Sequence, residues 1–217
     1  MTVIAIDGPA GAGKSSAARA LARALGFFYL DTGAMYRAVA AAALERGVPA
    51  GDEGRLAEIA RSVDVDVSGN RILVGGGDPS GRLRAPEVTA VVSQVAALPD
   101  VRAALAERQR AIARQHDVVI EGRDIGTAVA PDAEVKIFLT ASLPERARRR
   151  GRQLGVADDA LGGVAEALGE RDAADSTRAA SPLARPPDAV VIDSTDRPLE
   201  DVVRALLDIV EKRLDGF

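Results

Sequence analysis

The chain has 217 residues, of which 47% are hydrophobic, and its formal net charge is −4; this is enough for one α/β domain with a small insertion. It contains no Cys and a single His, His116, which excludes disulfides and thiolate metal sites and argues against a His-based zinc site or catalytic triad. The acidic balance argues against nucleic acid or an anionic membrane as a partner.

The first 62 residues alternate between short apolar runs and helix-forming segments. Strands are predicted at 3–7 and 27–30, and helices at 14–25, 34–46 and 53–62. Gly26 is expected to end the first helix, and Asp31 or Thr32 to cap the second.

The pattern changes near 63–83, where Val and Asp alternate from Val63 to Val67. A period of two predicts a half-exposed strand. A turn at 68–70, a return strand at 71–74 and a second turn at 75–77 are expected to follow. We therefore predict a small antiparallel insertion in an otherwise α/β chain.

The α/β alternation continues to the end of the chain. Helices are predicted at 86–97, 101–115, 144–154, 158–171 and 199–214, with Pro99 breaking the first two apart, and strands at 118–121, 134–139 and 189–192. The polar, Pro-containing segment 172–187 is expected to be mobile. Five short apolar strands alternating with helices predict a parallel, doubly wound sheet.

Residues 8–15, GPAGAGKS, match G-x-x-x-x-G-K-[ST] without a gap, between a predicted strand and a predicted helix. In such a P-loop the glycines let backbone N–H groups converge on phosphate oxygens, and the helix dipole points to the same place. The Lys reaches the β- and γ-phosphates, and the Ser hydroxyl can bind Mg²⁺. The predicted donor-binding residues are Gly8, Pro9, Ala10, Gly11, Ala12, Gly13, Lys14, Ser15 and Ser16, with Ser15 as the metal ligand.

A P-loop identifies a nucleotide but not a reaction, and a switch GTPase and a small-molecule kinase both remain open. A switch GTPase usually carries D-x-x-G after a strand and an N-K-x-D motif. Here the strand at 118–121 is followed by Gly-Arg-Asp, and the three lysines, Lys14, Lys136 and Lys212, leave no N-K-x-D. Arg residues follow strands instead, as binding of a phosphorylated acceptor would require.

The chain resembles the bacterial cytidylate kinases, nucleoside-monophosphate kinases of the P-loop fold, along nearly its whole length. The matching stretches are IDGPAGAGKSS, LDTGAMYRA, SQVAALPDVRAAL, VIEGRDIGT, PDAEVKIFLTAS, ERD with AADSTRAASPL, and VIDST. The resemblance implies a five-stranded parallel sheet flanked by helices. It implies a core of 1–31, 116–143 and 186–217, an inserted acceptor domain at 32–115 with the β insertion, and a helical lid at 144–185.

The resemblance also implies the site residues. Tyr36 and Arg37 match positions that hold the acceptor phosphate, and Thr32 a hydroxyl position in the same pocket. The cytosine-reading positions are matched by Ser93, Arg102 and Asp124, whose hydroxyl, guanidinium and carboxylate suit the polar edge of that base. The implied catalytic residues are Lys14, Arg123, Arg171 and Arg178. Arg123 and Arg178 also match substrate-binding positions, and Asp175 a partner of the sugar hydroxyls.

Two features carry less definite roles. Glu121 stands where the relatives carry Asp or a similar acid, and one methylene more than Asp would shift its carboxylate. The lid helix is strongly basic, with Arg146, Arg148, Arg149, Arg150 and Arg152. One or two of them are expected to touch the donor, and most to form a solvated face.

The resulting hypothesis is transfer of a phosphoryl group from ATP to CMP or dCMP with Mg²⁺, by a monomeric cytoplasmic protein. No apolar run approaches the ~20 residues of a membrane helix, and the first residues show no targeting pattern. UMP or another small metabolite as acceptor, and a nucleotide-dependent switch, remain as alternatives.

Overall fold

The computed structural model describes residues 1–68, 71–74 and 81–214. The predicted turn at 75–77 lies outside the described residues, as do residues 69–70 of the turn predicted at 68–70, whereas Ser68 ends a strand. Strands β1 to β7 span Val3–Asp7, Phe28–Asp31, Val65–Ser68, Arg71–Val74, Val118–Glu121, Val135–Thr140 and Val190–Asp193. They form one sheet in the order β3-β4-β2-β5-β1-β6-β7.

The predicted five-stranded parallel core is confirmed. β2, β5, β1, β6 and β7 pair in parallel, with Ile4 opposite Val119 on one side and Val135 on the other. β3 and β4 pair antiparallel, and β4 joins the edge of β2 in parallel at Tyr29 and Arg71. The hairpin therefore extends the main sheet at one edge. The division into three domains stays a prediction.

The helices fall close to their predicted positions. α1 to α8 span Lys14–Leu25, Thr32–Glu45, Glu53–Ser62, Pro86–Ala97, Pro99–Ala113, Leu143–Leu154, Leu161–Thr177 and Leu199–Leu214. Short helical turns occupy Arg82–Arg84, Ile125–Val129 and Asp158–Ala160. Asp31 caps α2 by accepting a hydrogen bond from the Ala34 N–H, and Gly26 ends α1 with a φ of 70°.

The break at Pro99 bends α4 against α5 by 93°. This is also the one helix pair in the described part of the chain whose joint length and composition would suit a broken membrane span. None of the individual helices described is long and apolar enough to cross a membrane.

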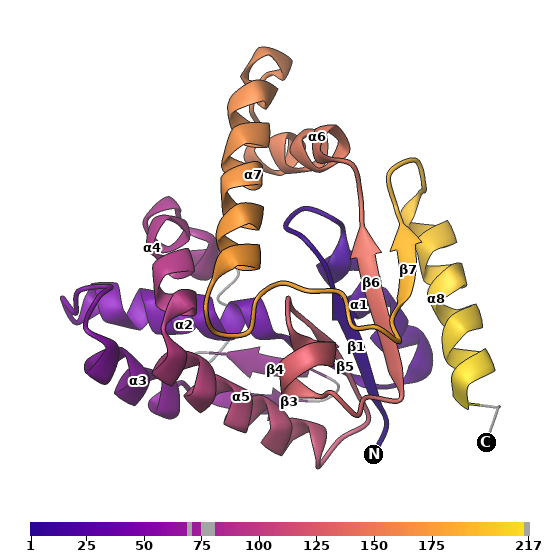
Figure 1. Cartoon of the computed structure of the whole chain (residues 1–217), viewed down its shortest axis with the longest axis horizontal. Helices are drawn as coiled ribbons and strands as arrows, with labels where there is room; N and C mark the ends of the chain where they lie inside the picture. Colours follow the sequence, from indigo (N-terminus) through magenta and orange to yellow (C-terminus); the bar gives the residue numbers. More distant parts are fainter. Residues whose placement is uncertain (69–70, 75–80, 215–217) are drawn as a thin grey trace.

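Strand alternation divides the core into two clusters, one on each face of the sheet. Ile4 and Ile6 of β1 pack with α1 and α8, whereas Ala5 between them joins the cluster formed with α2 to α5. In Figure 1, α8 lies beside β7, and α6 and α7 rise beyond the carboxyl ends of the strands. The parallel strands therefore deliver their last residues to one edge that helices enclose from several sides.

The segment expected to be mobile, 172–187, is helical in its first part, because α7 continues to Thr177 instead of ending at Arg171. This part carries Asp172, Asp175, Ser176 and Thr177 beside two alanines, and Pro182 is the first proline in the segment. Asp175 is only 8% exposed and pairs with Arg123 at 2.9 Å. The polar residues that suggested a loop are thus the ones that α7 turns toward other buried charges.

Gly8 offers a test of the close contact between the P-loop and β6. It has a φ of +146°, and a Cβ there would lie 2.0 Å from the Leu139 carbonyl oxygen. Gly26 also has a positive φ, but a Cβ there meets nothing within 4 Å. We expect Gly8→Ala to lower the free energy of unfolding by more than about 3 kcal/mol, and Gly26→Ala by about 1 kcal/mol. Urea denaturation measures both, and equal losses would contradict the steric argument.

Candidate active site

A cavity of about 770 Å³ opens at the carboxyl edge of the sheet. It is bounded by the P-loop, by α2 and α4, by the segment after β5, and by α6 and α7. All of the predicted site residues line it except Gly8 and Pro9. Residues far apart in the sequence therefore meet in one space, as expected for the carboxyl ends of parallel strands.

The P-loop joins β1 to α1 and exposes its backbone to the cavity. Gly11 and Gly13 have φ values of +78° and +90°, a left-handed conformation that costs other residues free energy. Gly13 precedes the first residue of α1 and has no side chain to cap the helix. The free N–H groups of that first turn and the helix dipole make this end of α1 suited to an anion.

Lys14, the first residue of α1, is buried with its ammonium at the cavity. Its Nζ donates to the Pro9 carbonyl oxygen at 2.7 Å. Burial, with help from the neighbouring Arg123, lowers the pKa of Lys14 to about 7, while Glu121 and Asp7 oppose the shift. A phosphate anion placed here would favour the charged ammonium.

Glu121 ends β5 and faces the first turn of α1. Its carboxylate accepts a hydrogen bond from Ser15 Oγ at 3.0 Å and another from the hydroxyl of Tyr29. Burial and the nearby Asp31 carboxylate raise the pKa of Glu121, while Lys14 opposes the shift. Oxygen atoms of Ser15 and Glu121 are thus in contact with each other, and oxygen atoms are the ligands that Mg²⁺ prefers.

The predicted base-reading residues lie on the far side of the cavity. Arg102 of α5 contacts Asp124 at 2.5 Å, and its other terminal nitrogen donates to the Ala96 carbonyl at 2.9 Å. The guanidinium also lies 5.3 Å from the centre of the Tyr36 ring, within the range of a cation–π contact. Ser93 of α4 lines the same region.

Carboxylates link the other arginines into a chain of ion pairs. Asp124 is approached by Arg178 at 3.5 Å, and Arg178 also approaches Asp175 at 3.5 Å. Asp175 in turn pairs with Nε of Arg123 at 2.9 Å. The chain connects α5, the segment after β5, and the end of α7. Arg178 therefore links the base-reading candidate Asp124 to the sugar-binding candidate Asp175.

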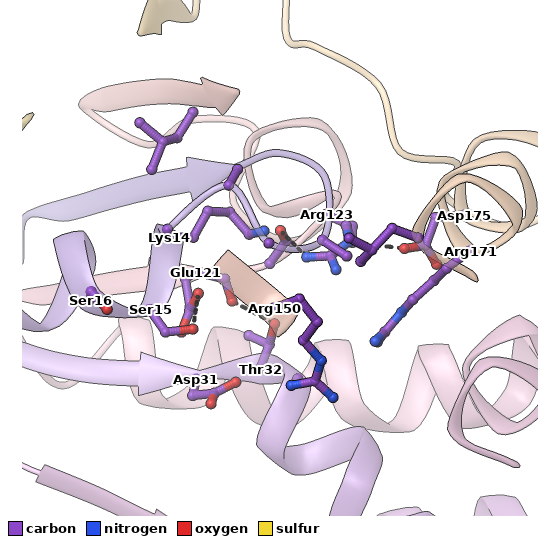
Figure 2. Close-up of a pocket in the computed structure, with 18 of the residues that line it drawn as sticks. Lys14, Ser15, Ser16, Asp31, Thr32, Glu121, Arg123, Arg150, Arg171 and Asp175 are labelled. Carbon is purple, nitrogen blue, oxygen red and sulfur yellow. Dashed lines mark hydrogen bonds and ion pairs between the residues drawn. The ribbon is translucent and has the colours of Figure 1, made fainter. Parts of the chain in front are cut away.

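Several buried guanidinium nitrogens lack a hydrogen-bond partner in the described residues, among them Nε of Arg102 and Nη2 of Arg178. Arg37 pairs with Asp31 at 2.9 Å, yet in the described part of the chain no hydrogen-bond partner reaches the buried Nε of Arg37 or of Arg171. Burial, together with Arg123, lowers the pKa of Arg171 to about 10. The side chains of Lys14, Arg123, Arg150 and Arg171 point into one space (Figure 2). This cluster of donors suits the oxygens of phosphoryl groups.

Thr32 lines the cavity and also bonds to the protein itself. It is 3% exposed as the first residue of α2, and its Oγ1 donates to the Glu121 carbonyl oxygen at 2.6 Å. Its hydroxyl proton therefore ties α2 to β5, although the residue still lines the cavity.

The expectation that most lid arginines form a solvated face is wrong. Arg146 is 8% exposed and Arg149 donates to the Ser194 carbonyl oxygen at 2.5 Å. Arg150 lines the cavity, where burial and then Arg84 and Arg37 lower its pKa. Of the five, Arg148 and Arg152 are the exposed ones. A helix read by itself does not reveal which of its charges meet other elements.

Sequence reasoning missed four polar groups around the site: Asp7, Tyr29, Arg84 and Asp172. Asp7, which ends β1, is 1% exposed and accepts from the N–H groups of Ile125 and Gly126, both at 2.8 Å. It thereby fixes the segment that follows Arg123 and Asp124. The one sequence signal that could have identified Asp7 is its position as an acid at the end of a strand, where sites of parallel sheets lie.

Comparison with known proteins gives a consistent result. A family model described as "Cytidylate kinase" matches residues 4–212. Proteins named cytidylate kinase from Mycobacterium avium (strain 104) and Pelotomaculum thermopropionicum are each 51% identical. The alignment with the Mycobacterium avium protein covers 97% of this chain and 96% of that protein. The alignment with the Pelotomaculum thermopropionicum protein covers 94% of this chain and 93% of that protein. The solved shikimate kinase from Bacteroides thetaiotaomicron, 17% identical, shares the fold with a TM-score of 0.52 over 97% of this chain and 98% of its own.

The burial of Asp7 predicts a specific pH dependence of stability. Burial raises its pKa from 3.8 to about 6. An acid with a raised folded-state pKa contributes most stability below its unfolded pKa and loses that contribution as the pH rises through the folded value. Between pH 4 and pH 6 we therefore expect wild-type stability to fall by about 2–3 kcal/mol relative to that of Asp7→Asn. Urea denaturation across this range measures the difference, and parallel curves would refute it.

Proposed function

The chain belongs to the cytidylate kinase family, and from that premise we propose that it transfers the γ-phosphoryl group of ATP to CMP or dCMP with the help of Mg²⁺. The products are ADP and CDP or dCDP. Transfer is direct and in line, because a loose phosphoryl-transfer transition state needs positioning and charge neutralisation rather than a covalent intermediate.

One observation carries the proposal: a single cavity joins a P-loop to a set of buried arginines with base-reading candidates beyond them. Two nucleotides that meet for transfer bring several negative charges together. Lys14, Arg123 and Arg171 face the place where the two would meet (Figure 2). The roles assigned to Lys14, Arg123, Arg171 and Arg178 follow from this charge requirement and stay part of the proposal.

The donor is assigned to the P-loop side. Backbone N–H groups of residues 11–16 and the Lys14 ammonium would hold its phosphates. Ser15 and Glu121 present oxygens that fit Mg²⁺, which when bound neutralises phosphate charge. In the described ranges no cluster of three or more His, Cys, Asp or Glu could hold a metal. A magnesium ion at Ser15 would therefore take most of its remaining ligands from phosphates and water.

The acceptor is assigned to the opposite side. Arg37 and Tyr36 would hold its phosphate, and Asp175 its sugar. Cytosine presents an exocyclic amine that the Asp124 carboxylate can accept from, with Arg102 and Ser93 serving the remaining polar atoms. Uracil presents a carbonyl oxygen at the position of that amine. This oxygen is a hydrogen-bond acceptor with partial negative charge, so it would be repelled by the Asp124 carboxylate. This difference favours CMP over the alternative acceptor UMP.

The test of the function is an acceptor panel in a coupled assay of ADP release. We expect CMP and dCMP to give turnover and UMP and AMP to give at least about tenfold less, because the wrong base leaves buried polar groups unpaired. Lys14→Ala should lose at least about 100-fold in kcat, since it removes a charge that acts on the transferred group, while its circular dichroism stays native. Turnover unchanged in Lys14→Ala, or slow ADP release that no acceptor stimulates, would refute the proposed function.

The base-reading role predicts a selective loss of acceptor affinity. Arg102→Ala should raise KM for CMP by about tenfold or more, as expected for loss of a charged hydrogen bond of at least about 1.4 kcal/mol. KM for ATP should stay within about twofold. Arg108→Ala is the matched control, because Arg108 lies on the same helix but bonds to the Arg61 carbonyl outside the cavity. Equal losses for both nucleotides would contradict base reading.

A further inference from the structure

The two helices of the predicted lid, α6 and α7, both form hydrogen bonds with the P-loop. The Ala10 N–H donates to Oδ1 of Asp172 on α7 at 3.2 Å, and Nη1 of Arg146 on α6 donates to the Ala10 carbonyl oxygen at 3.1 Å. Arg146 and Asp172 also form an ion pair with each other. Both backbone polar groups of Ala10 are therefore fixed by one pair of side chains.

Close packing accompanies these polar contacts. Ala10 is 6% exposed and lies in an apolar cluster with Ala147 of α6 and Leu168 of α7. A Cβ on the next residue, Gly11, would lie 3.1 Å from the Cβ of Arg146. The P-loop backbone is thus seated against α6 and α7, and small residues permit the approach.

The pair makes these contacts away from the nucleotide side. Neither Arg146 nor Asp172 lines the cavity. Arg146 commits its Nε to the Ala141 carbonyl oxygen at 3.0 Å in addition to its bond with Ala10. Its guanidinium is therefore engaged by the protein itself, unlike those of Arg150 and Arg171, which face the cavity.

From this geometry we propose that Arg146 and Asp172 are positioning residues that set the P-loop backbone for the donor phosphates. A phosphate-binding loop works when its N–H groups already point to one place before the ligand arrives. Fixing Ala10 at both its N–H and its carbonyl oxygen reduces the conformational freedom of the loop immediately before Gly11 and Gly13. The inference rests on the proposed function, because it concerns the donor half of that site.

The same pair places a second group. Asp172 directly follows Arg171 on α7, so the contact that anchors Asp172 to the P-loop also sets where the Arg171 guanidinium enters the cavity. The contact further implies that the base of the lid moves together with the P-loop. Closure over bound nucleotides is then left to the outer parts of α6 and α7 and to the acceptor side.

The experiment separates positioning from general stability. Removing one charge of a buried pair leaves the other unpaired, whereas removing both can leave the fold intact. We therefore choose the double variant Arg146→Met with Asp172→Ala, which keeps most of the Arg146 stem. Arg146→Lys is the milder variant, since it keeps the charge but cannot serve Asp172, Ala10 and Ala141 together. Arg148→Met is the matched control, because Arg148 is exposed on the same helix and pairs with Glu145.

Calorimetric titration with ADP plus Mg²⁺ and, separately, with CMP measures the two halves of the site. We expect the double variant to bind ADP about tenfold more weakly, a loss of about 1.4 kcal/mol, and to bind CMP within about twofold of wild type. Its kcat should fall while KM for CMP stays unchanged. Arg148→Met should bind both nucleotides like the wild type.

Each contrary result has one meaning. ADP affinity unchanged in a folded double variant, or equal losses for ADP and CMP, would overturn the positioning role. If the double variant does not fold, Arg146→Lys is measured in its place. We then expect ADP to bind at least about threefold more weakly, and unchanged ADP affinity in Arg146→Lys would overturn the inference. A wild-type chain that binds ADP but no CMP would instead overturn the proposed acceptor and leave the P-loop contact standing.

Discussion

The arrangement of this site depends on burying guanidinium groups at the carboxyl edge of the sheet. A buried charge is costly unless it has a partner. Asp124 and Asp175 each contact two arginines, and two of these, Arg123 and Arg178, are also assigned to phosphoryl transfer. Burial and neighbouring positive charge lower the pKa values of Arg150, Arg171 and Arg178. Guanidinium groups are therefore crowded along the cavity, and phosphoryl oxygens would supply negative charge to them.

Carboxylates at the ends of three strands help to hold this crowded arrangement together. Asp7, Glu121 and Asp31 end neighbouring strands, and each carboxylate accepts hydrogen bonds that fix a segment of the cavity wall. Such bonds hold positively charged segments close together before any nucleotide is present. Charge-assisted hydrogen bonds from fixed groups are the stronger kind, so a wall built this way can keep its shape despite mutual repulsion among its arginines.

Sequence alone was sufficient for the features that are local. The strands are predictable because short apolar runs that are bounded by turn residues and alternate with longer helical segments favour buried parallel strands. The P-loop is predictable because its motif occupies eight consecutive residues. The end of α7 is predicted too early in the chain, because Asp172 and Asp175 are typical of loops unless their partners are known. Those partners, Ala10 and Arg123, lie 162 and 52 positions away in the chain. No local pattern carries such a pairing, and the same holds for Arg84 and the lid arginines.

Glu121 shows how a departure from a family pattern can be accommodated. The resemblance places Asp or a similar acid at this position, and a Glu adds one rotatable bond to an Asp, whose freedom must be lost when the carboxylate is fixed. Here one carboxylate oxygen accepts from Tyr29 Oη and the other from Ser15 Oγ. Tyr29 comes from β2, two residues before Asp31, so the sheet register brings its hydroxyl to the longer side chain. The added length is thus offset by a second anchoring bond, and an immobile carboxylate still faces the first turn of α1.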